Sequence, residues 1–184
     1  MLLLSAAFLV LAGCAGERTG QTDTTGKTEE ETGLFSAFTA TSLAGDEVDQ
    51  SIFEGKTLTM VNIWATSCSP CIGEMPDLAQ LNRDYADQNV QVVGIVIDVL
   101  NRDGTVSKEQ VQAANDIIAS TGADYTHLLP SDDLIEAKLA EVSAVPTTVF
   151  VDETGAQVGE DYLGARSADK WSEIIDGLLE DLAK

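Results

Sequence analysis

Two apolar runs in the middle of the chain predict the centre of a β-sheet. Leu58–Ala65 and Val90–Asp98 hold apolar residues at neighbouring positions, so both faces of each strand are expected to be buried. Thr147–Asp152 predicts a third strand, and the turn that follows it leads into an antiparallel partner at Gln157–Leu163. Shorter strands are expected in an N-terminal hairpin over residues 38–48 and at residues 125–129.

Helical periodicity fills the spaces between these strands. Apolar residues recur at helical spacing over residues 69–87 and along one face of residues 108–120. Ser131, with two aspartates after it, predicts the start of a further helix. Strands that alternate with helices in this way predict an α/β sandwich. The clearest helical stripe closes the chain and is expected to pack in the core; it comprises Trp171, Ile174, Ile175, Leu178, Leu179 and Leu182.

The candidate chemistry lies in the octapeptide 64–71, Trp-Ala-Thr-Ser-Cys-Ser-Pro-Cys, which connects the first apolar run to the helix after it. Partial positive charge and unpaired N–H groups at a helix N-terminus favour a thiolate. Cys68, at or just before the helix start, is therefore expected to be the attacking thiolate. Cys71, one turn further on, is expected to resolve the mixed disulfide. Pro70 suits the first helical turn, because that turn cannot pair its N–H.

Glu74 follows Cys71 by three residues, so both side chains are expected on one side of the helix. A partly buried carboxylate in that position is able to take the proton of the resolving thiol. The alternative is a solvated glutamate that the helix dipole favours.

The cysteine pair also has a competing interpretation as half of a zinc site, but zinc requires four ligands and the chain has no second CxxC and no HxxxH. No metal and no cofactor are therefore expected.

The charge balance narrows the class of partner. The 184 residues carry a formal net charge of −21, so the surface lacks the basic footprint that nucleic-acid binding requires. Such a surface is typical of a protein that stays soluble outside the cell. The three cysteines are too few for a disulfide-stapled scaffold, and the odd one, Cys14, needs a separate role.

The N-terminal segment reads as an export signal followed by an anchor. Residues 1–13 are apolar throughout and shorter than the ~20 residues of a membrane-spanning helix, so a signal peptide is expected. The sequence Leu-Ala-Gly-Cys at 11–14 resembles the bacterial lipobox, which implies a lipid on Cys14. No Lys or Arg precedes Arg18, and an ordinary cleaved signal peptide is the alternative. Residues 14–33 are expected to form the lipidated cysteine and a disordered tether, with the folded domain over 34–184.

Three motifs carry a resemblance to a known family. The first runs over Val61–Cys71 and continues with Gly73–Pro76, the second is Ala144–Asp152, and the third is Tyr162–Gly164. Together they resemble the membrane-anchored TlpA/ResA-like thiol–disulfide oxidoreductases of the thioredoxin superfamily. The resemblance implies a thioredoxin-like α/β fold, with helices around a central mixed sheet, an N-terminal β-hairpin and a central αβ insertion. Asn62 stands where many cytosolic thioredoxins carry a buried aspartate, which suits a family that uses a glutamate in the helix instead.

The resemblance also implies roles for single residues. It places an active-site glutamate at Glu74. It implies a cis peptide bond before Pro146, with the backbone of Val145 offered to a substrate strand. Trp64 and Ser67 are expected beside them on the substrate surface. Ser67 departs from the pattern, because the family usually has tryptophan directly before the first cysteine, and serine removes that flat apolar platform.

These features predict an extracytoplasmic enzyme, lipid-anchored on the outer face of a bacterial cell membrane. Its CSPC dithiol is expected to reduce disulfides of exported proteins, in cytochrome c maturation or in the repair of surface proteins. A reductant outside the cytoplasm must itself be reduced again, so the resemblance implies a membrane thiol-transfer partner of the CcdA or DsbD type. The domain is expected to act as a monomer and to bind no nucleic acid.

Three other functions on the same fold compete with this one. A copper or metal chaperone usually carries CxxxC and a distal histidine, whereas the only histidine here, His127, is more typical of a core residue. A peroxidase of the peroxiredoxin pattern needs threonine three residues before its cysteine, where Ala65 stands. A redox-inert binding lipoprotein is disfavoured because both cysteines of the pair are present.

Overall fold

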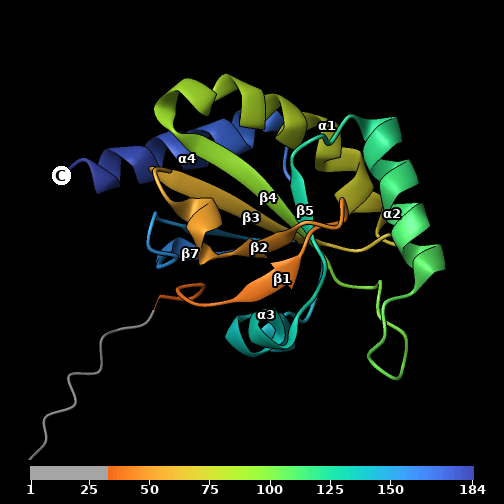
Figure 1. Cartoon of the computed structure of the whole chain (residues 1–184). Helices are drawn as coiled ribbons and strands as arrows, with labels where there is room; N and C mark the ends of the chain where they lie inside the picture. The colour runs from red at the N-terminus through yellow and green to blue at the C-terminus, as the bar shows by residue number, and fades with distance from the viewer. Residues whose placement is uncertain (1–32) are drawn as a thin grey trace, which may run out of the picture. The chain divides into compact units, whose positions relative to one another are not determined.

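The computed structural model describes residues 33–184, so Cys14, the predicted signal peptide and nearly all of the predicted tether lie outside the described residues. A five-stranded sheet crosses the domain in the order β5-β4-β3-β6-β7 (Figure 1). None of the helices in residues 33–184 has the length and apolar character that a membrane crossing requires. The strands are β3 (Leu58–Trp64), β4 (Val90–Val96), β5 (Thr126–Leu128), β6 (Thr147–Val151) and β7 (Gln157–Leu163).

The sheet contains both parallel and antiparallel strand pairs, and this pairing decides which strand ends lie next to the CxxC octapeptide. β3 pairs in parallel with β4, and β4 with β5, because each of these connections crosses back through a helix. β6 pairs antiparallel to both β3 and β7. Every residue of β3 is buried, which confirms the predicted central strand. Because β6 runs antiparallel to β3, its first residue, Thr147, pairs with Ile63 near the end of β3. The C-terminal end of β3 and the N-terminal end of β6 therefore lie side by side.

Different sets of elements cover the two faces of the sheet. Alternate residues of a strand point to opposite faces, and those of β3 divide accordingly: Met60 and Trp64 join one core cluster, whereas Val61 and Ile63 join the other. α1 (Ser69–Asp84), α2 (Lys108–Thr121) and α4 (Ala168–Leu182) cover the first face. The second face is covered by the hairpin β1 (Thr39–Thr41) and β2 (Glu47–Asp49), the short helices η1 (Gln50–Phe53) and η3 (Leu139–Glu141), and α3 (Asp132–Ala137). Figure 1 shows α1 and α4 on one side of the sheet and α3 on the other.

The predicted architecture is confirmed, with differences at the ends of elements. Along the chain, α2 and β5 follow β4 and precede β6, where the resemblance implies a central αβ insertion. The helix predicted to reach residue 87 ends at Asp84, because the chain turns through η2 (Ala86–Gln88) and the left-handed Asn89 into β4. β4 ends at Val96 rather than Asp98, and Asp98 leaves the sheet to contact the octapeptide.

Candidate active site

The two cysteines of the octapeptide form a disulfide at the N-terminus of α1. Cys68 is the N-cap residue, and its Sγ accepts a hydrogen bond from the backbone N–H of Cys71 at 3.2 Å. Cys68 is half-buried, whereas Cys71 is completely buried. Only the Cys68 sulfur is therefore accessible from outside the domain, and the positive end of the helix dipole lies beside it.

The segment before β6 lies against this disulfide. The Val145–Pro146 peptide bond is cis, as the resemblance implies, and Val145 O lies 3.6 Å from Cys68 Sγ. Within residues 33–184 the N–H and C=O of Val145 make no backbone hydrogen bond, so both remain open to a partner strand. The carbonyl of Pro146 accepts from the N–H of Gly164 at 2.8 Å, which brings the end of β7 and the 55% exposed Leu163 to the same place.

Glu74 is buried on α1, one helical turn after Cys71, and is only 3% exposed. Its Oε1 accepts from Asn62 Nδ2 at 3.1 Å, and its Oε2 accepts from the N–H of Arg166 at 3.1 Å and from Trp171 Nε1 at 3.4 Å. Burial raises the pKa of Glu74 above its ordinary value, although these hydrogen bonds and the nearby Arg166 charge oppose the rise. A carboxyl group with a raised pKa is a suitable proton acceptor for chemistry near neutral pH.

Asn62, in β3, connects Glu74 to β6. Its Nδ2 donates both to Glu74 Oε1 and to Thr148 Oγ1, each at 3.1 Å. The side chain is completely buried, and its Oδ1 has no hydrogen-bond partner among the described residues. A buried acceptor without a protein partner costs stability and is uncommon in folded proteins.

Asp98 holds the loop that precedes Cys68, a role that the sequence analysis missed. Its carboxylate accepts from the N–H and hydroxyl of Thr66 at 2.8 Å, and from the N–H and hydroxyl of the exposed Ser67 at 3.2 Å. Burial works against ionisation, but these hydrogen bonds outweigh it and keep the pKa of Asp98 below its ordinary value. A negative charge is therefore fixed beside the residue before the reactive cysteine. The one available signal was an acidic residue at the end of an apolar run.

Trp64 does not have the position that the sequence analysis expected. The side chain is completely buried, so it offers no surface to a substrate, and the expected direct contact is corrected. Its Nε1 donates to His127 Nδ1 at 3.2 Å, which leaves Nε2 of His127 to donate to the carbonyl of Ala123 at 3.0 Å. Burial lowers the pKa of His127 from 6.5 to about 4, so the ring is neutral at physiological pH. Trp64 and His127 both belong to the core that supports the site.

Arg166 is a second residue that the sequence analysis missed. Besides the backbone contact with Glu74, its Nη1 donates to Leu163 O and Gly164 O at 3.1 and 2.8 Å, and its guanidinium lies 4.9 Å from the centre of the Trp171 ring. The segment before α4 is thereby fixed against both the buried carboxylate and the end of β7. Nothing in the sequence indicates this contact, because 92 residues separate Arg166 from Glu74.

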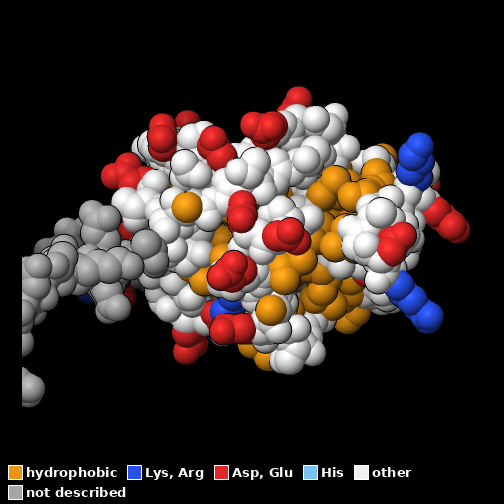
Figure 2. Space-filling model, turned by 60° about the horizontal axis from the view of Figure 1, so that its bottom comes forward, with side chains coloured by type: hydrophobic (Ala, Val, Ile, Leu, Met, Phe, Trp, Pro, Cys, Tyr) orange, Lys and Arg blue, Asp and Glu red, His pale blue; other side chains and the backbone are white. Residues whose placement is uncertain are grey.

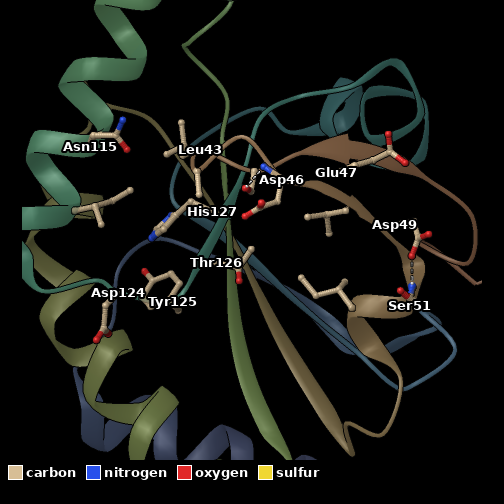
Figure 3. A pocket seen from close by; sticks show the side chains of 15 residues that line it. Leu43, Asp46, Glu47, Asp49, Ser51, Asn115, Asp124, Tyr125, Thr126 and His127 are labelled. Atoms are coloured by element: carbon tan, nitrogen blue, oxygen red, sulfur yellow. Dashed lines mark hydrogen bonds between the residues drawn. The ribbon is translucent and has the colours of Figure 1, made fainter.

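The surface and the cavities add little to the chemistry of the disulfide. Figure 2 shows Asp and Glu side chains scattered over one face of the domain, with apolar side chains gathered between them. A pocket of about 550 Å³ opens between the hairpin, α2 and β5, and neither cysteine lines it (Figure 3). Its lining includes Asp46, Glu47, Asp49 and Asp124. In the part of the chain that the structure describes, no group of three or more His, Cys, Asp or Glu residues is placed to hold a metal ion.

The fold and the site define a thioredoxin-like domain whose CxxC disulfide lies beside a cis-proline. The chain belongs to the Redoxin family, whose model matches residues 28–175, and it is similar to thiol–disulfide oxidoreductases of the ResA and DsbE kind. It is 34% identical over 144 residues to the thiol-disulfide oxidoreductase ResA of Oceanobacillus iheyensis, covering 75% of this chain and 66% of that protein. It is 28% identical over 143 residues to the thioredoxin-like protein YneN of Bacillus subtilis, covering 76% and 75%.

Solved structures show the same fold. A thioredoxin-family thiol:disulfide interchange protein from Chlorobium tepidum superposes with a TM-score of 0.64 at 24% identity, covering 78% of this chain and 93% of that one. A secreted Mycobacterium tuberculosis disulfide oxidoreductase, described as homologous to E. coli DsbE, superposes with a TM-score of 0.60 at 26% identity, covering 80% and 98%. The predicted fold and class are thus confirmed. The chain spans 66% of the length of the Oceanobacillus relative, just under two thirds.

Proposed function

We propose that this protein works outside the cytoplasm and reduces the disulfide bonds of exported proteins. The observation that carries the proposal is the placement of the two sulfurs. Cys68 is half-buried at the N-terminus of α1 and contacts Val145, whereas Cys71 lies fully buried behind it. One sulfur is open to a client, and the other is reserved for the second step. The Ser-Pro dipeptide between them is similar to that of reducing thioredoxins, which favours reduction over oxidation.

The reaction transfers two electrons from the dithiol to the client. In the reduced protein, the Cys68 thiolate attacks a client disulfide, forms a mixed disulfide and releases the first client thiolate. Cys71 then loses its proton and attacks Cys68 Sγ, which releases the second client thiolate and forms the Cys68–Cys71 disulfide. We assign the proton of Cys71 to Glu74, because both side chains are buried one turn apart on α1 and burial favours the protonated carboxyl.

The client strand is expected to lie beside Pro146. There it pairs with the free N–H and C=O of Val145, in the manner of a strand added to a sheet edge. Leu163 supplies exposed apolar surface next to Pro146, in place of the tryptophan that the family usually has where Ser67 stands. The Ser67 hydroxyl already donates to Asp98, so it contributes little hydrogen bonding to a client.

The proposed location follows from the N-terminal sequence. Residues 1–13 act as the signal peptide, the lipid on Cys14 anchors the protein to the outer face of the membrane, and residues 14–33 tether the domain that begins at residue 34. A membrane thiol-transfer protein of the CcdA or DsbD type supplies electrons, and apocytochrome c or oxidised surface proteins are the clients. The secreted relative from Mycobacterium tuberculosis and the relatives named ResA support this proposal.

Insulin reduction by dithiothreitol tests the proposed activity with the full chain. The wild type is expected to accelerate the reduction, and Cys68→Ser to abolish the acceleration. Cys71→Ser is expected to retain the first attack and to accumulate a mixed disulfide with insulin. Cys14→Ser, the same substitution at the cysteine outside the domain, serves as the matched control and keeps the wild-type rate. Equal rates for the wild type and Cys68→Ser would contradict the proposal.

A further inference from the structure

The two oxygens of Glu74 differ in what their partners can do. Oε2 faces the backbone N–H of Arg166 and the indole N–H of Trp171, and both groups are donors only. Oε1 faces the side-chain amide of Asn62, which carries a donor at one end and an acceptor at the other. A proton on Oε2 would oppose two N–H groups that cannot accept it. The proton that Glu74 gains therefore belongs on Oε1.

The Asn62 amide is able to serve both protonation states of Glu74. When Glu74 is ionised, Nδ2 donates to Oε1 and to Thr148 Oγ1, as the structure shows. When Oε1 carries a proton, rotation of the amide by half a turn places Oδ1 where Nδ2 was, and the new O–H donates to it. The Thr148 hydroxyl both donates and accepts, so it turns as well and donates to Oδ1. Each orientation satisfies Glu74 and Thr148, and each leaves the outer end of the amide without a partner, as Oδ1 is now.

We propose that Asn62 is a positioning residue whose amide reverses each time Glu74 gains or loses its proton, with Thr148 reversing alongside it. The proton of Cys71 then has a hydrogen-bonded place on Oε1, and its departure leaves no unpaired group on the carboxylate. This inference deepens the proposed function and rests on Glu74 as the proton acceptor. It also explains the buried, unpaired Oδ1, because an amide that must turn over cannot have fixed partners at both ends.

The groups around Glu74 fit this assignment. The Arg166 guanidinium favours the ionised carboxylate, and the Cys68–Cys71 pair lies on the same helix. The buried hydroxyl of Tyr125 has no hydrogen-bond partner in the described residues; burial and the Glu74 charge both raise the pKa of Tyr125, so that ring stays neutral. Asn62 is the one hydrogen-bond partner of Glu74 recorded in residues 33–184 that can both donate and accept.

Titration of Glu74 tests the proposal in the oxidised full chain, where the two cysteines do not titrate. The readout is the carboxyl ¹³C resonance of Glu74. With a reversing amide, Asn62→Leu removes one hydrogen bond from each protonation state, so the pKa of Glu74 changes by less than about half a unit. A fixed Asn62 donor stabilises only the ionised state, and its loss raises that pKa by about one to two units. Such a rise overturns the proposal. Trp171→Phe removes an obligate donor and raises the pKa, which shows that the readout is sensitive.

The wild type provides an independent measurement if Asn62→Leu does not fold. Nuclear Overhauser contacts from the Asn62 amide protons to Thr148 are expected at pH values above the midpoint of the Glu74 titration. They are expected to disappear at lower pH, because the amide has then turned away. Contacts that persist through the whole titration overturn the proposal. Neither measurement requires turnover. An amide that reverses in a protein without disulfide-reducing activity would therefore leave this inference standing and contradict only the proposed function.

Discussion

Acid destabilises this domain through His127, and the size of the effect follows from the ring's surroundings. His127 is 3% exposed, its Nδ1 already accepts from Trp64, and its Nε2 donates to Ala123 O. Gly94, its partner across the strand pair, leaves room for the ring, and a side chain there would collide with it. A second proton on the ring would break the bond from Trp64 and place a charge in the core. Burial accordingly lowers the pKa of His127 from 6.5 to about 4.

The direction of the effect follows from comparing the native and unfolded states. The unfolded chain takes up the proton near pH 6.5, whereas the native protein resists it until about pH 4. Between these values the unfolded state binds more protons, so the free energy of unfolding falls as the pH falls. The contribution of His127 is fully present above pH 6.5 and is lost by about pH 4. It amounts to about 3 kcal/mol.

Urea denaturation of the wild type and His127→Leu at a series of pH values measures this contribution. Leucine leaves the Trp64 N–H unpaired, so the variant is less stable than the wild type at neutral pH by about 1–3 kcal/mol. The variant lacks the titrating ring. As the pH falls from 6.5 to 4, the wild type is therefore expected to lose about 3 kcal/mol more unfolding free energy than the variant does. Two curves that stay parallel over that range would show that His127 does not cause the loss of stability in acid.

Three further predictions concern the site and the anchor. Glu74→Gln is expected to slow disulfide reduction by roughly 10²-fold and to move the rise of the rate with pH to higher pH, because Cys71 loses its proton acceptor; an unchanged pH–rate profile would exclude that role. Asp98→Asn is expected to lower the pKa of the Cys68 thiol by up to about one unit, since a nearby negative charge disfavours the thiolate, whereas Ser67→Ala keeps the charge and leaves that pKa unchanged. Thiolate absorbance across pH measures both, and equal shifts in the two variants would indicate a purely structural role. Cys14→Ala is expected to move the full chain from the detergent phase to the aqueous phase, and unchanged partitioning would favour simple secretion.

Local patterns predicted the elements that build the site. The unbroken apolar run of β3 indicated a central strand, and the following Cys68 indicated a helix start, because the sequence there changes from strand to helical periodicity. These signals lie within a few neighbouring residues. The cis peptide bond before Pro146 could be predicted only from the family resemblance, because most X–Pro bonds are trans. The buried Trp64 is the last residue of a strand with two buried faces, so the same pattern already argued against its exposure.

Long-range contacts account for what the sequence could not show. Asp98 binds Thr66 and Ser67 across 31 to 32 residues, and Arg166 reaches Glu74 across 92. Neither residue belongs to a periodic pattern, so only the paired strands reveal which loops share the sheet edge. The unpaired Oδ1 of Asn62 is likewise a property of packing, since the residue type alone allows every hydrogen bond to be satisfied.

The reduction potential of the Cys68–Cys71 couple decides whether the protein reduces or oxidises the disulfides of its clients. Equilibration of the full chain with glutathione or dithiothreitol redox buffers measures it, with Cys14→Ser as a control that leaves the value unchanged. For a disulfide reductant we predict a potential of about −270 mV or below, in the range of thioredoxin. A potential near about −120 mV would identify an oxidant and contradict the proposed direction of electron flow.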